Sequence, residues 1–326
     1  MKKENITMIK NMLLGSFLWG SFTGLETCVW ATELLQLQAI SSGSRIKYDD
    51  PVTCELVRKL EAAGQSKQSP NFAELMDLIN HGAHPYVGNS RNWTLWHFAA
   101  KFNRSDILLQ FIEKVKIFDL GQECLIDCFN QKNAIGRTPI HEAVMNNSNE
   151  VLPILIWNGG DLLAKDNCGQ TPLHIAAHVG NLFAMRTLIW GFRAKQSDLL
   201  QQYVNESDDF GETALYAAIA SNKYQAAKIL LAYGAFLGIQ NSFGRTPLHK
   251  AVSKGDSSMI QMLLETADHR LQNQPNDFER YVNTTDCLRK TALDIARTTE
   301  LNETKKQEII RILRHYGPRM DVESYF

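Results

Sequence analysis

The chain has 326 residues, of which 44% are hydrophobic and 21% charged, a composition typical of a folded protein rather than a disordered one. Its 34 basic and 35 acidic residues give a formal net charge of −1. Because the charges balance and no block of Lys and Arg occurs, the sequence gives no electrostatic indication that this protein binds nucleic acid.

The first 31 residues have the order of a secretory signal peptide. Lysines precede a short apolar run at 12–20, and Ala31 offers a small residue at a cleavage site. The run is shorter than the roughly 20 residues that span a bilayer, so no membrane span is expected in the mature chain. We therefore predict an exported protein, periplasmic or secreted, with residues 32–50 as a linker. The alternative is a cytoplasmic protein whose N-terminus forms a helix that caps the folded domain.

A seven-residue pattern recurs along the rest of the chain. Its clearest copy is Thr171-Pro172-Leu173-His174-Ile175-Ala176-Ala177, close copies begin at Thr138 and Thr246, and looser copies begin at Thr94, Thr213 and Thr291. The six threonines are 44, 33, 42, 33 and 45 residues apart. Threonine suits the cap of a helix and proline its first turn. A base period of 33 with this core resembles the ankyrin-repeat family, in which each unit is a β-turn followed by two antiparallel helices.

The resemblance implies an all-α fold, an ankyrin-repeat solenoid of about six to seven helix-turn-helix units with β-turn tips over residues 51–326. The units are expected near 51–88, 91–129, 133–165, 166–204, 208–240, 241–282 and 286–320. It also implies a structural role for the motif, in which the threonine caps the first helix and the histidine bonds backbone groups of the neighbouring turn. The residues in this role are Thr138, His141, Thr171, His174, Thr246 and His249.

Three of the five intervals are nine to twelve residues longer than 33, with the added segments around 116–129, 192–204 and 268–282. Apolar residues four apart, such as Leu125 with Phe129 and Leu199 with Tyr203, predict a short extra helix in each segment that docks on the array. These helices either contribute to binding or only cover exposed apolar edges, and the sequence favours neither.

The turn tips are the candidate binding site. Three residues before each motif threonine stand Arg91, Ile135, Cys168, Phe210, Phe243 and Leu288, of which five are apolar. Exposed apolar rows mark interaction surfaces, although the tip side chains could instead pack on one another. The resemblance implies a non-enzymatic, monomeric module that binds another protein through tips and first-helix ends. The predicted contact residues are Ile135, Arg137, Cys168, Gln170, His178, Phe210, Glu212, Phe243, Arg245 and Lys254.

The sequence predicts no catalytic residue, cofactor or metal ligand. It has no phosphate-binding GxxxxGK[ST] loop, GxSxG elbow or HExxH pair. Cys124 and Cys128 lie one helical turn apart and are interpreted as small buried hydrophobes. A less favoured alternative is a cysteine-dependent enzyme in which one of them is the nucleophile and a motif histidine the base. Bacteria that live inside host cells often carry ankyrin proteins that act on host partners, so an exported bacterial effector is one form the function would take.

Overall fold

The computed structural model describes residues 50–66, 68–117 and 122–316, so the predicted signal peptide and nearly all of the linker lie outside the described residues. The chain divides into two compact units, one of residues 1–59 and 73–84, and one of residues 60–72 and 85–326. Within the described ranges, no helix is both long enough and apolar enough to cross a bilayer.

The first unit contains the start of α3 (Pro51–Gln65) and most of α4 (Phe72–Asn80). Helix α3 begins where the Asp50 carboxylate accepts the backbone N–H groups of Val52 and Thr53, at 2.9 and 3.0 Å. After α4, Gly82 has a φ of 98°, a left-handed conformation that ends a helix and suits glycine. Both helices lie within the range 51–88 that the sequence predicts for the first unit.

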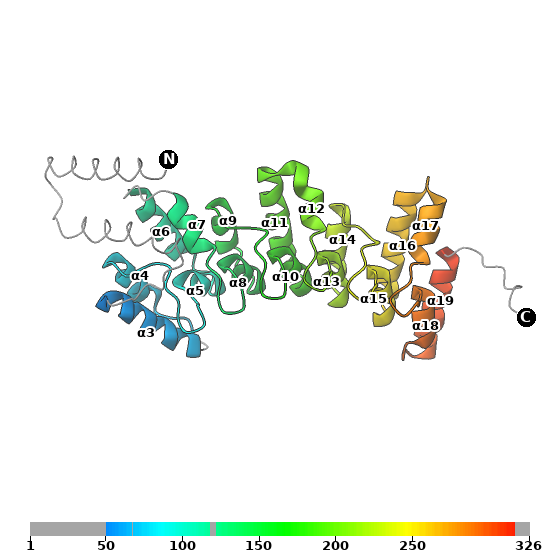
Figure 1. Cartoon of the computed structure of the whole chain (residues 1–326), viewed down its shortest axis with the longest axis horizontal. Coiled ribbons are helices and arrows are strands. Elements are labelled where there is room, and N and C mark those ends of the chain that lie inside the picture. The colour runs from blue at the N-terminus through cyan, green and yellow to red at the C-terminus, as the bar shows by residue number, and fades with distance from the viewer. Residues whose placement is uncertain (1–49, 67, 118–121, 317–326) are drawn as a thin grey trace, which may run out of the picture. The chain divides into compact units, whose positions relative to one another are not determined.

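The second unit is a succession of helix pairs. The pairs are α5 (Leu95–Lys101) with α6 (Ser105–Ile117), α8 (Pro139–Met145) with α9 (Val151–Trp157), α10 (Pro172–Val179) with α11 (Leu182–Lys195), α13 (Ala214–Ala220) with α14 (Tyr224–Ala232), α15 (Pro247–Lys254) with α16 (Ser257–Leu271), and α18 (Ala292–Thr298) with α19 (Glu303–Tyr316). Successive first helices α5, α8, α10, α13, α15 and α18 contact one another (Figure 1). The expected all-α solenoid is confirmed.

Each first helix begins at its motif threonine, as predicted. Thr138 has an extended backbone, with φ −90° and ψ 167°, and Pro139 occupies the first turn. The Thr138 N–H lies 3.1 Å from His141 Nδ1, while His141 Nε2 lies 3.1 Å from the Gln170 carbonyl oxygen in the next repeat. Because that oxygen can only accept, Nε2 carries the hydrogen and Nδ1 is the acceptor. The neutral ring therefore ties a helix cap to the neighbouring repeat.

The same bonds recur at the other motif histidines. His97, His174 and His249 each place Nε2 2.9 to 3.2 Å from a backbone carbonyl of the following repeat and Nδ1 near the N–H of their own threonine. Burial lowers the pKa of both His97 and His141 to about 4, which keeps these rings neutral at pH 7. The structural role that the resemblance implied for these residues is thus seen in the geometry.

Each of the three added segments contains a helix. These are α7 (Gln122–Phe129), the 3-10 turn η1 (Ser197–Leu199) with α12 (Leu200–Val204), and α17 (Pro275–Val282). Leu125 and Phe129 are buried as expected, but Leu199 is 47% exposed, so its predicted packing is wrong. Tyr203 instead holds the second insertion, because its buried ring stacks on Phe192 of α11 at 4.1 Å between centroids.

The insertions accompany long second helices. In repeats with an insertion the second helices α6, α11 and α16 have 13, 14 and 15 residues, whereas α9 and α14 in the repeats between them have 7 and 9. The asparagine after α7 bonds the first insertion to the next repeat. Asn130 Nδ2 donates to the Gly159 carbonyl at 2.9 Å, and Asn130 Oδ1 accepts the Asp161 N–H at 2.7 Å, so the insertion is bonded to the turn that ends α9.

Candidate functional site

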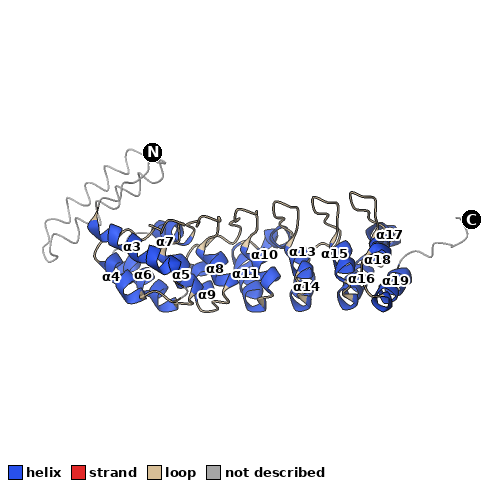
Figure 2. Ribbon diagram, turned by 90° about the horizontal axis from the view of Figure 1, so that it is seen from below, coloured by secondary structure: helices blue, strands red, loops and turns tan. Residues whose placement is uncertain are grey.

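The tips of the second unit are tight turns closed by a buried Asn or Asp. At the tip that carries Phe210, the Asp208 carboxylate accepts the backbone N–H groups of Phe210 and Glu212, at 2.9 and 2.8 Å. The Asp208 N–H in turn donates to the Glu212 carbonyl at 2.9 Å. The tip loops project from one side of the helix rows (Figure 2). Each tip is therefore shaped by bonds within five residues.

The same pair of hydrogen bonds to an Asn or Asp side chain occurs in all six tips. The contact residues predicted from the sequence do not include these Asn and Asp residues. The side chains that accept the two N–H groups are Asn89, Asn133, Asp166, Asp208, Asn241 and Asp286. The signal is visible in the sequence, because an Asn or Asp stands five residues before each motif threonine. Such side chains favour turns by bonding the backbone two residues on.

Neighbouring tips are also bonded to one another through their backbones. The carbonyl of Ile135 accepts the Asn167 N–H at 3.0 Å, and the carbonyl of Phe210 accepts the Ser242 N–H at 2.8 Å. Equivalent bonds run from Ala134 to Arg91, from Asp209 to Cys168 and from Cys287 to Phe243. The acceptor is in every case the residue three before the motif threonine. Among the predicted contact residues, Ile135, Cys168, Phe210 and Phe243 therefore each have a backbone bonded to the next tip.

The side chains at these positions remain exposed. Ile135, Phe210, Phe243 and Leu288 have exposed fractions between 49% and 68%, and Cys168 is also exposed. These side chains face solvent, so the alternative in which tip side chains bury one another is not what the structure shows. The tips thus form a row of apolar side chains on a bonded backbone, which we call the tip row.

Two arginines predicted to contact the partner are engaged in the scaffold. The Nε atoms of Arg137 and Arg245 each lie 3.5 Å from a carboxylate oxygen of the next tip, in Asp166 and Asp286 respectively. Burial disfavours the charge on Asp286, but backbone N–H groups of Lys290 and Leu288 and the Arg245 guanidinium outweigh it, and its pKa is lowered. The Arg137 side chain is only 20% exposed. Both arginines therefore hold consecutive tips together.

The remaining predicted contact residues are divided between scaffold and surface. Gln170 and Glu212 are half-buried, and their carbonyls accept from the preceding motif histidines. Burial raises the pKa of the Glu212 carboxyl, which accepts a hydrogen bond from Asn241 Nδ2 at 3.1 Å. His178 and Lys254 are exposed in the last turns of α10 and α15, the first helices that follow the tips of Cys168 and Phe243.

The cysteine-dependent alternative would take its base from the motif histidines. Cys124 and Cys128 are buried in α7. Burial raises the pKa of the Cys128 thiol well above its ordinary value, whereas the hydrogen bond with Cys128 lowers the pKa of the Cys124 thiol. Each motif histidine already uses both ring nitrogens in the capping bonds. Within the described ranges, no group of three or more His, Cys, Asp or Glu side chains is placed to hold a metal ion.

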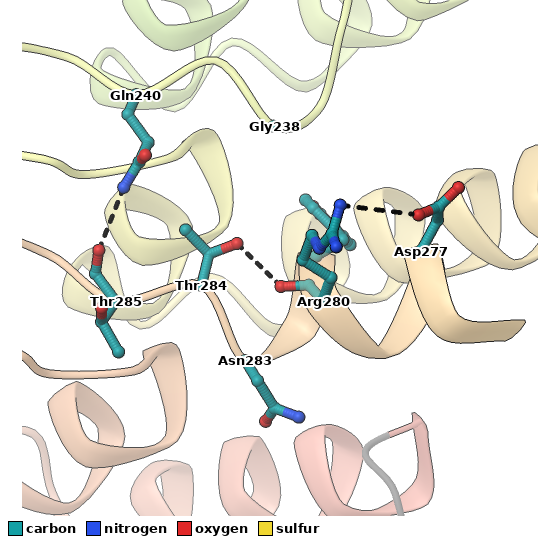
Figure 3. Close-up of a pocket in the computed structure, with 8 residues that line it drawn as sticks. Gly238, Gln240, Asp277, Arg280, Asn283, Thr284 and Thr285 are labelled. Carbon is teal, nitrogen blue, oxygen red and sulfur yellow. Dashed lines mark hydrogen bonds and ion pairs between the residues drawn. The ribbon is translucent and has the colours of Figure 1, made fainter.

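A cavity of about 660 Å³ lies where the loop after α14 faces α17 (Figure 3). It is lined by Gly238, Gln240, Asp277, Arg280, Tyr281, Asn283, Thr284 and Thr285. Arg280 lies 3.9 Å from Asp277, and Gln240 Nε2 donates to the Thr285 carbonyl at 3.0 Å. Its charged groups are thus already paired with each other, and the tip row is the stronger candidate for binding.

Comparison with known proteins identifies the repeats. A family model for ankyrin repeats in three copies matches residues 96–198, 140–241 and 190–274, which together cover more than half of the chain. The human neurogenic locus notch homolog protein 1 is 33% identical over 196 residues, 59% of this chain but 7% of that protein. The probable 26S proteasome regulatory subunit p28 of Saccharomyces cerevisiae is 31% identical over 136 residues, 41% of this chain and 57% of that protein.

The solved ankyrin repeat domain of Bcl-3 is similar in fold, with a TM-score of 0.55 and 19% sequence identity, over 82% of this chain and 100% of that domain. The family model matches the part of the chain that contains the capped helices α8, α10 and α15 and their motif histidines. This chain belongs to the ankyrin-repeat family.

Proposed function

We propose that this protein binds a partner protein through the tip row. The observation that carries the proposal is the combination of exposed apolar side chains with a backbone that is bonded from tip to tip. Anchors that are already fixed lose little conformational entropy on binding, which favours affinity. Exposed large apolar side chains on successive tips are also consistent with an interaction surface. The exposed ends of α10 and α15, with His178 and Lys254, would extend the contact.

The paired substitution Phe210→Asp with Phe243→Asp is expected to weaken partner binding by at least about 100-fold, because it places two charges among the central apolar anchors. A pull-down with residues 32–326 supplies the partner, and calorimetry of the purified pair measures the change. The thermal transition should stay nearly unchanged, since exposed substitutions alter stability by within about 0.5 kcal/mol.

Phe236→Asp is the matched control, because Phe236 is 48% exposed but lies outside the tips. It should leave partner binding intact. If the tip variant captures the partner as well as the unaltered chain does, the tip row is not the binding site.

We also propose that residues 1–31 direct export, on the basis of the lysines and the short apolar run that follows them. A host protein would then be a candidate partner for an exported bacterial protein. After expression in a bacterium with a secretion pathway, the mature chain is expected to begin at Thr32. N-terminal sequencing that finds an intact Met1 or Lys2 would instead support the cytoplasmic scaffold.

A further inference from the structure

A second exposed aromatic cluster lies on the second helices, away from the tip row. Trp157 at the end of α9 and Trp190 in α11 are 51% and 60% exposed, and their rings meet edge to face with centroids 5.2 Å apart. Phe183, two turns before Trp190 on the same helix, is also exposed. Helices α9 and α11 lie next to each other in the row of second helices (Figure 1).

The unequal lengths of the two helices explain why the tryptophans are not covered. Helix α9 ends at Trp157, after 7 residues, while α11 runs on for 14. The helices are in close contact beneath this point, because a Cβ added at Gly191 would lie 2.7 Å from the Ile156 side chain. Lys195 Nζ donates to the Ile156 carbonyl at 2.8 Å and closes the contact. The packing is thus complete without Trp157 or Trp190.

Two arginines flank Trp190 on the exposed side of α11. Arg186 and Arg193 stand four residues before and three residues after it, so the three side chains share one face of the helix. Neither arginine forms an ion pair with another described residue. Helices α9 and α11 contain no Asp or Glu. The acid that follows α9, Asp161, accepts the Leu163 N–H at 2.9 Å.

We propose that this surface, the α11 face of Trp157, Phe183, Arg186, Trp190 and Arg193, binds an acidic segment of a partner protein that also carries apolar side chains. Tryptophan and arginine are the residues most enriched among those that dominate binding energy at protein interfaces. Two arginines about two helical turns apart, neither in an ion pair with another described residue, can each bind a carboxylate through two parallel hydrogen bonds. The exposed rings of Trp157, Phe183 and Trp190 would contact the apolar side chains that lie between those carboxylates in the partner segment.

The charge on this face favours a protein segment over an anionic membrane. Membrane-binding basic clusters use about 4–8 Lys and Arg, whereas the α11 face offers two arginines. The proposal is independent of the tip row, which lies on the turns that precede the first helices. The two surfaces can therefore be tested separately.

The probe is a displayed library of random 16-residue peptides, selected on the full chain and counter-selected on a variant with Trp190→Ala, Arg186→Glu and Arg193→Glu. The peptides retained are expected to be net negative and to contain aromatic or aliphatic residues. Synthetic copies should bind at least about tenfold more weakly to Trp190→Ala alone. The separate pair Arg186→Glu with Arg193→Glu should weaken binding similarly and reduce its dependence on salt.

Two controls separate this face from other surfaces. The Phe210→Asp with Phe243→Asp variant should bind these peptides normally, as should Leu109→Ala, which removes an exposed side chain from α6. The proposal is wrong if no retained peptide depends on the α11 face, or if the dependent peptides carry no net negative charge. It is also overturned if anionic vesicles rather than peptides bind there, or if sedimentation shows that Trp190→Ala dissociates a dimer of this chain.

Discussion

Acidification from pH 7.5 to pH 5 is expected to lower the free energy of unfolding by about 4 kcal/mol through His97 and His141 alone. Both rings are buried, and their pKa is lowered to about 4 in the folded protein, against 6.5 for an ordinary histidine. Below pH 6.5 the unfolded chain therefore binds more protons than the folded chain. Stability is complete above that pH and is lost as the pH falls toward 4.

Carboxyl groups also change the dependence of stability on pH, and the direction depends on how the fold shifts the pKa of each. The pKa of the Glu142 carboxyl is raised by burial, so Glu142 opposes the loss by binding its proton more tightly in the folded state. Carboxyl groups whose pKa is lowered, such as Asp286, act in the same direction as the histidines but mainly below pH 5. The range from pH 7.5 to pH 5 thus isolates most of the histidine contribution.

Urea unfolding at several pH values measures this loss. The matched variant is His141→Gln, because glutamine suits the third position of a capped helix and does not titrate. It should be less stable at pH 7.5 and should show a smaller pH dependence between 6.5 and 5, by nearly one proton. A free energy of unfolding that is constant across this range would show that the motif histidines are not buried as neutral rings.

Truncation of Tyr203 is expected to destabilise the protein by about 3–5 kcal/mol, as for other large aromatic side chains in a packed interior. Tyr203 is buried to 1% exposure, and its ring lies parallel to that of Phe192, with an interplanar angle of 4°. It is the ring that joins α12 to α11. Tyr203→Ala should therefore lower the midpoint of thermal unfolding and release the second insertion.

Two variants make this prediction specific. The Tyr203 hydroxyl is buried and makes no hydrogen bond with any described residue, so Tyr203→Phe should be neutral or stabilising. Leu199→Ala, in the same insertion but at a side chain that is 47% exposed, should change stability by within about 0.5 kcal/mol. Equal losses in Leu199→Ala and Tyr203→Ala would contradict the idea that this stacked ring anchors the insertion.

The repeats could be predicted from the sequence because their signals are local. A threonine cap and a proline in the first turn each act within a few residues, so each copy of the motif starts its own helix. The insertions were equally visible as added length with apolar residues four apart. The packing partner of each insertion was not, since Leu199 and Tyr203 have the same local pattern but opposite burial.

The sequence by itself determined the family, the position of each helix pair and the row of apolar tips, because a repeat encodes its fold in short-range patterns. Only the tertiary structure decided which side chains at the tips are exposed and which are paired with the next repeat. Arg137 and Arg245 look like surface residues until the next repeat brings a carboxylate to each. Trp157 and Trp190 look like core residues until a 7-residue helix is set beside one of 14. The exposure of a side chain depends on the neighbouring repeat, which lies some 30 to 40 residues away in the chain.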